Sequence, residues 1–123
     1  MDSTVEQALK HDDLIDITTA GRKTGKPHRV EIAFHNFDGM LYITGSPGTR
    51  DWYANLLANP RFTFHLKQST QADIPAQAIP ITDEAERRRV LTKVVEKWKQ
   101  QDKLNAFVQS SPLVEVRLEP TGS

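Results

Sequence analysis

The sequence contains no cysteine, and this absence excludes a disulfide framework, cysteine-ligated zinc or iron–sulfur sites and thiol nucleophiles. Neither sign of charge prevails, because 16 Lys and Arg balance 16 Asp and Glu, which argues against a nucleic-acid coat protein or a polyanionic tail protein. No apolar run approaches about 18 residues, so we expect no membrane span. The N-terminal part has no basic segment followed by an apolar one, so we expect no secretory signal and a cytoplasmic location.

The length of 123 residues fits one domain, which we take as residues 1–123. Its dominant pattern is a series of short segments in which apolar and polar residues alternate. Val30, Ile32 and Phe34, for example, fall on one face of the segment 28–37. Gly, Pro and Asn residues between these segments are typical of turns. Six strands are expected, over residues 14–19, 28–37, 40–44, 61–67, 72–81 and 113–118.

Four other stretches favour helices. Residues 3–11 follow a Ser/Thr cap, and residues 51–58 precede an Asn-Pro stop signal. A long helix opens at residues 82–86 with the spacing of a capping pair, and a short one is expected over 103–108. Short links favour antiparallel strand pairing, and closing a sheet removes its exposed edges. We therefore expect a mainly β (α+β) protein, with a barrel of about six antiparallel strands and flanking helices.

The turn expected between the first two strands is rich in positive charge. Arg22, Lys23, Lys26 and Arg29 lie within eight residues, with no acid among them. Such a cluster is costly unless it is solvated or matched by an anion. Arg offers bidentate geometry to phosphate or carboxylate, Lys adds a point charge, and the two glycines of the turn let a ligand approach the backbone. A solvated turn with incidental charges explains the residues equally well.

A second candidate is the loop 44–50, which leads into a helix at Asp51 and Trp52. A loop of small residues at a helix start exposes unpaired backbone N–H groups, which suit anionic or carbonyl ligand atoms. Arg50 adds a cation beside them. The loop ends in no Gly-Lys-Ser/Thr and has no dinucleotide fingerprint, and a simple strand-to-helix turn is the plainer interpretation of these residues alone.

Other residue types give weaker signals. A pair such as Trp52-Tyr53 lies in a core more often than it forms the wall of a ligand site. The four histidines are scattered, and His35 and His65 fall on faces expected to point outward, so we expect no metal site. No Ser/His/Asp arrangement is present, and the catalytic residues stay unknown. Candidates for a proton donor are Tyr42, Tyr53 and His28.

Two blocks of the sequence resemble the deazaflavin-dependent nitroreductase family, which belongs to the flavin and deazaflavin oxidoreductases. Residues 18–30 (TTAGRKTGKPHRV) are similar to the family's signature hairpin, and residues 41–60 (LYITGSPGTRDWYANLLANP) to its strand, loop and helix. The blocks occur in the family's order and spacing, and the resemblance covers about residues 14–119. It implies an FMN-binding-type split β-barrel with oxidoreductase activity.

The resemblance also implies a cofactor, coenzyme F-420, a 5-deazaflavin with a phosphodiester and an oligoglutamate tail. In this family the hairpin binds the anionic tail, the loop after the strand lies along the tricyclic ring, and the helix start lies near both. The cofactor supplies the hydride while the protein binds and orients it, which accounts for the lack of a catalytic motif. The residues implied are Arg22, Lys23, Thr24, Arg29, Thr44, Gly45, Ser46, Pro47, Arg50, Asp51 and Trp52.

The sequence differs from the best-known members at positions that bear on the ligand. Pro47 stands where they carry Lys, and Glu31 where they have a polar amide. Residues 95–99 stand where they place tyrosines in the substrate pocket, so the acceptor is described only as a small quinone-like, enone-like or nitroaromatic molecule. FMN, and the haem-type or fatty-acid ligands of relatives, stay open as alternatives to coenzyme F-420.

We compare three functions. The first is an oxidoreductase that moves a hydride from reduced deazaflavin, or FMN, to such an acceptor. The second is a cofactor or ligand carrier without turnover. The third is a barrel for single-stranded nucleic acid, in which Phe62 and Phe64 would stack on bases. Their shared inward face with Leu66 and the neutral net charge argue against this last function, so we expect no nucleic-acid partner. A homodimer is compatible with the fold.

Overall fold

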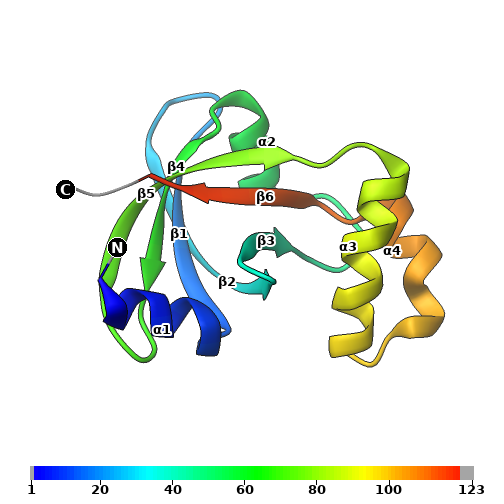
Figure 1. Ribbon diagram of the computed structural model, residues 1–123. Helices are drawn as coiled ribbons and strands as arrows, with labels where there is room; N and C mark the ends of the chain where they lie inside the picture. The colour runs from blue at the N-terminus through cyan, green and yellow to red at the C-terminus, as the bar shows by residue number, and fades with distance from the viewer. Residues whose placement is uncertain (1, 120–123) are drawn as a thin grey trace.

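Six antiparallel strands form a closed barrel in the computed structural model, which describes residues 2–119 (Figure 1). Around the barrel the order is β1-β2-β3-β6-β5-β4, and β1 pairs with β4 to close it. The expected barrel of antiparallel strands is confirmed. The strands are β1 (Leu14–Ala20), β2 (Pro27–Phe37), β3 (Met40–Thr44), β4 (Arg61–Leu66), β5 (Ala72–Pro80) and β6 (Leu113–Leu118).

The alternation in the sequence fills the barrel with apolar side chains. Ile15 and Ile17 on β1 face Phe64 on β4, and all three are fully buried. The rings of Phe34 and Phe64 meet edge to face with their centroids 5.4 Å apart. Burial of one such side chain contributes about 1.5–3 kcal/mol, so this core fixes the register of the strands.

Helices cover the ends and one side of the barrel. The N-terminal helix places its buried residues Ala8 and Leu9 in the barrel core. It begins after Asp2, whose Oδ1 accepts a hydrogen bond from the Thr4 N–H at 2.6 Å, so an Asp supplies the cap that we expected from Ser or Thr. The helices are α1 (Ser3–His11), α2 (Asp51–Ala58), α3 (Glu84–Lys97), the 3-10 turn η1 (Gln101–Lys103) and α4 (Leu104–Ser110).

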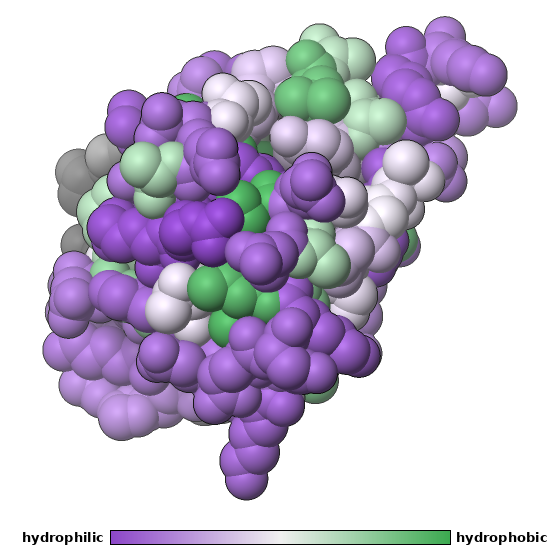
Figure 2. Space-filling model, turned by 90° about the vertical axis from the view of Figure 1, so that its right-hand side faces the viewer, coloured by the Kyte–Doolittle hydropathy of each residue, from purple (hydrophilic) through white to green (hydrophobic). Residues whose placement is uncertain are grey.

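A second core lies outside the barrel, between its β3 and β6 side and the layer formed by α3 and α4 (Figure 1). Tyr42 and Leu113 point outward from the two strands and pack against Val94 and Phe107 of the helices. The opposite face of this helical layer is mostly hydrophilic, with small hydrophobic patches (Figure 2). Among residues 2–119, none of the helices is long and apolar enough to cross a membrane.

The second core corrects our expectation for His35. His35 does lie on the outer face of β2, but its side chain is buried there, 1% exposed, between the rings of Phe37 and Trp98. Burial, with a smaller effect of the Lys97 ammonium, lowers the pKa of His35 to about 4. The strand pattern could not show this burial, because the covering residues come from a helix about sixty residues later.

His65 is a second correction. It is also buried, 7% exposed, on the outer face of β4. Its Nε2 lies 2.7 Å from the Thr18 hydroxyl and its Nδ1 lies 2.6 Å from the Asp73 carboxylate. Both ring nitrogens are thus engaged with neighbouring strands, and this histidine stabilises the surface of the sheet.

Candidate functional site

The β1–β2 turn holds three basic or polar side chains clear of the barrel. Gly21 N–H donates to the Lys26 carbonyl and Gly25 N–H to the Gly21 carbonyl, each at 2.8 Å. Gly25 has φ +75°, a left-handed conformation that costs a glycine little because it has no Cβ. The turn therefore has a defined shape, and it exposes the side chains of Arg22, Lys23 and Thr24.

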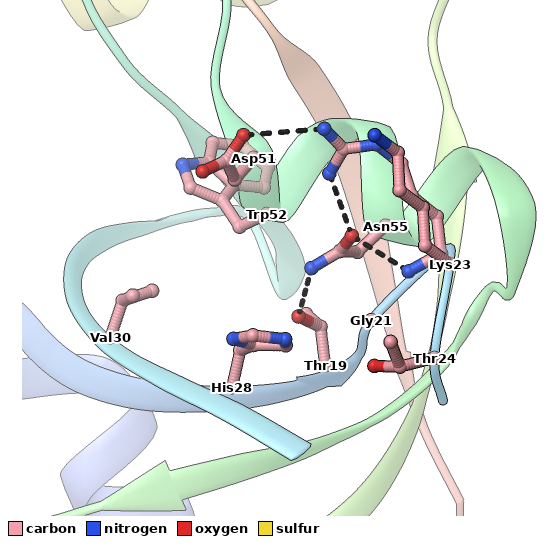
Figure 3. Close-up of a pocket in the computed structure, with 10 residues that line it drawn as sticks. Thr19, Gly21, Lys23, Thr24, His28, Val30, Asp51, Trp52 and Asn55 are labelled. Carbon is pink, nitrogen blue, oxygen red and sulfur yellow. Dashed lines mark hydrogen bonds and ion pairs between the residues drawn. The ribbon is translucent and has the colours of Figure 1, made fainter. Parts of the chain in front are cut away.

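A pocket of about 340 Å³ lies between this turn and helix α2 (Figure 3). Residues of β1, the turn and β2 form one side, and the first turns of α2 form the other. The pocket thus joins the β1–β2 turn to the start of α2, about twenty-five residues later, and none of residues 44–50 is among its lining residues. Its lining residues are Thr19, Gly21, Arg22, Lys23, Thr24, His28, Val30, Asp51, Trp52 and Asn55.

Asn55 connects the helix to the turn. Its Oδ1 accepts hydrogen bonds from the Arg22 backbone N–H at 3.1 Å and from Arg22 Nη1 at 3.0 Å, while its Nδ2 donates to Thr19 Oγ1 at 3.1 Å (Figure 3). Asn55 and Thr19 are both buried, so each of these bonds satisfies a polar group that water does not reach. The contacts fix where the Arg22 guanidinium points.

Positive charge exceeds negative charge in the pocket. Arg22 Nη2 lies 3.5 Å from the Asp51 carboxylate, a pair that is largely exposed and therefore weak. The ion pairs found among residues 2–119 involve neither Lys23 nor Lys26. The start of α2 adds the partial positive charge of a helix N-terminus at the same wall. An anionic ligand is the chemical complement of this arrangement.

The pocket also has an apolar side. Trp52 is 8% exposed, packs in the barrel core and meets Tyr53 edge to face at 5.9 Å. Val30 on β2 is 40% exposed and lies on the same side of the strands as Trp52 (Figure 3). Trp52 is therefore both a core residue and a wall of the pocket. The sequence analysis had treated these two roles as alternatives.

Arg29 lies outside the pocket. It alternates with His28 and Val30 on β2, so its side chain is on the outer face of the barrel, where Nε donates to Asp16 Oδ2 at 2.9 Å. Lys67 donates to the same carboxylate at 2.7 Å and also pairs with Glu31. The hydrogen bond from Lys67, together with Arg29, lowers the pKa of Asp16. Arg29 thus belongs to an ion cluster on a different face from Arg22 and Lys23.

The loop 44–50 is held by its own contacts and lines a different cavity. Thr44 is buried and its Oγ1 donates to the Pro112 carbonyl, whereas Ser46 and Pro47 are exposed. Arg50 folds back over the loop: Nη2 donates to the Ser46 carbonyl at 3.1 Å and Nη1 to the Thr49 carbonyl at 3.0 Å. Its guanidinium would lie only 3.5 Å from a Cβ on Gly45. Arg50 lines a second cavity of about 690 Å³, on the other side of α2.

The three candidates for a proton donor separate in space. Tyr42 is buried in the second core, and its hydroxyl accepts a hydrogen bond from Arg89 Nη2 at 3.3 Å. Tyr53 lines the second cavity. His28 alone lines the pocket between the turn and α2.

Sequence reasoning missed Thr19 and Asn55. A signal for Asn55 was available, since it follows Asp51 by four and Trp52 by three positions and so shares their helix face. Asn55 lies within the block 41–60, but the resemblance assigned it no role, and its amide carries no charge that would mark it as a ligand. Thr19 was assigned to a strand, where its inward hydroxyl needs a partner from another element.

Solved structures with low sequence identity share this fold. A conserved hypothetical protein from Mycobacterium tuberculosis is 15% identical with a TM-score of 0.78, covering 98% of this chain and 81% of that one. An FAD-binding protein from Mesorhizobium loti is 17% identical with a TM-score of 0.71, covering 98% and 91%. An F420-H2 dependent reductase is 18% identical with a TM-score of 0.63, covering 86% and 95%. These likenesses confirm the expected split-barrel fold.

A protein-family model matches almost the whole sequence. It describes the F420H2-dependent quinone reductases and spans residues 1–119, which include the turn, the loop 44–50 and helix α2. The match selects the deazaflavin coenzyme F-420 over FMN, and an oxidoreductase over a carrier without turnover. The chain is a member of the F420H2-dependent quinone reductase family.

Proposed function

We propose that residues 1–123 form one domain that binds coenzyme F-420 in the pocket between the β1–β2 turn and α2, and that the domain reduces a small quinone-like acceptor. The observation that carries the proposal is this shared pocket. It places the cations Arg22 and Lys23 beside the apolar wall formed by Trp52 and Val30. A ligand with an anionic tail and a flat head needs both features within one cavity.

The chemistry of the pocket fits the phosphodiester end of the cofactor. Arg22 offers the fork of donors that matches a phosphate, and Lys23 adds a second cation. The Thr24 hydroxyl adds a neutral hydrogen-bond donor to the same pocket, and the N-terminus of α2 adds partial positive charge. Arg29 points to another face of the barrel and contributes only at long range, so we assign it no direct contact.

The flat ring is assigned to the apolar side of the pocket. Trp52 provides an aromatic wall, and the exposed loop residues Ser46 and Pro47 lie at the end of β3, beyond which α2 begins. The Arg50 guanidinium packs against Gly45 and holds the loop in shape through its two carbonyl contacts. In this assignment Thr44, Gly45 and Arg50 position the loop, and Ser46 and Pro47, which do not line the pocket itself, would contact the part of the ring that extends beyond it.

When it is bound in its reduced form, coenzyme F-420 supplies a hydride to the acceptor. Reduction of a quinone to a quinol also consumes a proton. The residues of the pocket bind the tail, orient the ring and leave one side accessible, since Lys23, His28 and Val30 are exposed. The protein therefore acts by positioning, and the proton comes from His28 or from water that reaches the pocket.

The proposal predicts a defined pattern in a binding titration. Coenzyme F-420 should bind with a Kd below about 100 µM, which corresponds to about 5.5 kcal/mol, and FMN should bind more weakly. Reduced cofactor should be reoxidised when menadione is added and not when it is omitted. Absence of F-420 binding at this level contradicts the proposal, and binding without reoxidation by quinones, enones or nitroaromatics would make the domain a carrier.

We further propose that two copies associate as a homodimer. Within residues 2–119 the closed barrel leaves no strand edge unpaired, so the copies would pack through faces of the barrel rather than by joining sheets. Sedimentation at micromolar concentration should show a species of twice the chain mass of 13.9 kDa. A single species at the chain mass contradicts the dimer without affecting the cofactor assignment.

A further inference from the structure

We propose that Thr18, His65 and Asp73 form a second reactive centre, in which the Thr18 hydroxyl accepts the acyl group of a small carboxylic ester. The three side chains lie on the outer face of the barrel, on β1, β4 and β5, which are neighbours in the sheet (Figure 1). None of them lines the proposed cofactor pocket, so this centre is separate from it and does not depend on it.

The hydrogen bonds of His65 determine which of its ring nitrogens carries the proton. Asp73 Oδ1 lies 2.6 Å from Nδ1, and a carboxylate can only accept, so Nδ1 is the protonated nitrogen. The neutral ring then has no proton on Nε2, and the Thr18 hydroxyl donates to this nitrogen at 2.7 Å. A hydroxyl that donates to an imidazole, which is itself oriented by a carboxylate, is the arrangement of an activated nucleophile.

The neighbouring carboxylate does not compete with Asp73 for the His65 ring. Asp16 lies directly opposite His65 in the β1–β4 pair, but it is already paired with Arg29 at 2.9 Å and with Lys67 at 2.7 Å. His65 is 7% exposed, so water has little access to its ring. The packing of the sheet therefore holds the hydroxyl, the base and the carboxylate in place.

A cavity of about 350 Å³ gives a substrate access to the hydroxyl. Thr18 lines this cavity and His65 does not, so an ester meets the nucleophile while the base stays buried. Arg61 lines the same cavity, and its Nη2 lies 3.0 Å from the Glu119 carboxylate. The guanidinium has further N–H donors, which can stabilise the negative charge that develops on the carbonyl oxygen of the ester.

The proposed reaction is acyl transfer followed by hydrolysis. Thr18 Oγ1 attacks the carbonyl carbon of the ester while its proton passes to His65 Nε2. The ester C–O bond breaks and the leaving oxygen takes this proton, so an alcohol departs and an acyl ester remains on Thr18. Water then attacks this acyl ester with the help of the same base, which releases the carboxylic acid and restores the hydroxyl. Nothing is oxidised or reduced.

The test uses the purified full chain without coenzyme F-420, and p-nitrophenyl acetate is the ester. Surface lysines also react with this compound, so the readout is the rate of acetylation at Thr18, located by mass spectrometry of the peptides. We expect His65→Gln to slow this acetylation about hundredfold, an effect typical of the loss of a general base. Thr18→Ser keeps a hydroxyl and should still be acetylated. Thr92→Val, which removes a hydroxyl from α3, serves as the control.

Asp73 is a positioning residue, and its effect is measured on the His65 ring. Nitrogen-15 NMR should show the proton on Nδ1 in the wild type. Asp73→Ala should move part of this proton to Nε2 and slow the acetylation of Thr18. Asp73→Asn, whose amide oxygen still accepts a hydrogen bond, should restore the proton to Nδ1. A carboxylate that only stabilised the fold would not change the tautomer.

Two outcomes overturn the proposal. One is acetylation of lysines with none at Thr18, a result that needs no variant. The other is acetylation of Thr18 at the same rate in wild type and in His65→Gln, with a thermal melt to show that the variant is folded. Because the assay omits the cofactor, either outcome leaves the cofactor assignment intact, and a failure of coenzyme F-420 to bind leaves this proposal intact.

Discussion

The side-chain amide of Asn55 holds Arg22 at two points, the backbone N–H and the guanidinium. One residue of α2 therefore fixes both the course of the turn and the direction of its first cation. Since the same amide also donates to Thr19, the helix, the turn and β1 are joined at one buried position. The preorganisation of the pocket depends on this residue, although it carries no charge.

Replacement of Asn55 by Ala should weaken binding of coenzyme F-420 about tenfold, or about 1.4 kcal/mol, because Arg22 loses its fixed direction. The measurement is the dissociation constant of the intact cofactor, with a thermal melt to show that the variant is folded. Gln109→Ala, at an exposed position on α4, serves as the control. Unchanged affinity in a folded Asn55→Ala variant would show that Arg22 does not need this contact.

The double variant Arg22→Ala, Lys23→Ala should lose affinity for the intact cofactor by about thirtyfold and bind the tail-less analogue as the wild type does. The reason is that two cations contribute to the tail and not to the ring. Arg88→Ala with Lys103→Ala removes the same charge from the helical layer and should have little effect. Equal losses for both ligands would show that the turn does not hold the tail.

Gly21→Ala should disturb the pocket through His28. The new Cβ would lie 2.8 Å from the imidazole Nε2, so the ring must move. We expect weaker binding of the intact cofactor, because the displaced ring lines the same pocket as Arg22 and Lys23. The double variant Gly21→Ala, His28→Ala should be no worse than His28→Ala alone, and full additivity of the two changes in a double-mutant cycle would contradict the contact.

Acid should destabilise the interface between the barrel and its helical layer through His35. The pKa of His35 is about 4 in the folded protein and 6.5 is the ordinary value, so the unfolded chain takes up the proton first as the pH falls. The corresponding stability is fully present above about pH 6.5, is lost as the pH falls towards 4, and amounts to about 3 kcal/mol. Urea unfolding of wild type and His35→Leu at pH 7 and pH 5 measures it, and parallel losses in the two proteins would contradict the assignment.

Arg87→Met should destabilise the protein by about 3 kcal/mol without affecting the cofactor pocket directly. The Arg87 guanidinium donates to the carbonyls of Ile81, Phe107, Val108 and Ser111, and so it satisfies the end of α4. Arg88→Met, at an exposed position on the same helix, should change the free energy of unfolding by less than about 0.5 kcal/mol. Similar effects of the two substitutions in urea unfolding would refute the role of Arg87.

Much of the fold could be predicted from the sequence because its pattern is local. Alternation along β1, β2 and β4 identifies the inward side chains, and the capping pair at the start of α3 is present, with the Asp83 carboxylate accepting from the Glu86 N–H. What the pattern could not show is which outer faces are covered. His35 was expected to face solvent and is buried, because α3 reaches it from a distant part of the chain.

The candidate site was predictable to a similar extent. Charge and glycine content marked Arg22 and Lys23, and the pocket indeed joins them to Asp51 and Trp52. By charge alone Arg29 could not be distinguished from Arg22 and Lys23. Consecutive residues of a strand point to opposite faces of the sheet, however, and the Arg29 side chain lies on the outer face, where it pairs with Asp16. Closeness in sequence to Arg22 and Lys23 therefore did not place Arg29 in the pocket. Its side of the sheet is set by whether it falls on an inward or an outward position of β2.

The closed ladder of six strands has a consequence for how such proteins diversify. Every strand already has neighbours on both sides, so insertions and substitutions in the segments between strands leave the pairing of the sheet intact. The turn 21–26 and the loop 45–50 can therefore drift in evolution almost independently of the scaffold. Related proteins can therefore acquire new ligand preferences through changes in these two segments while the six-stranded barrel keeps its geometry.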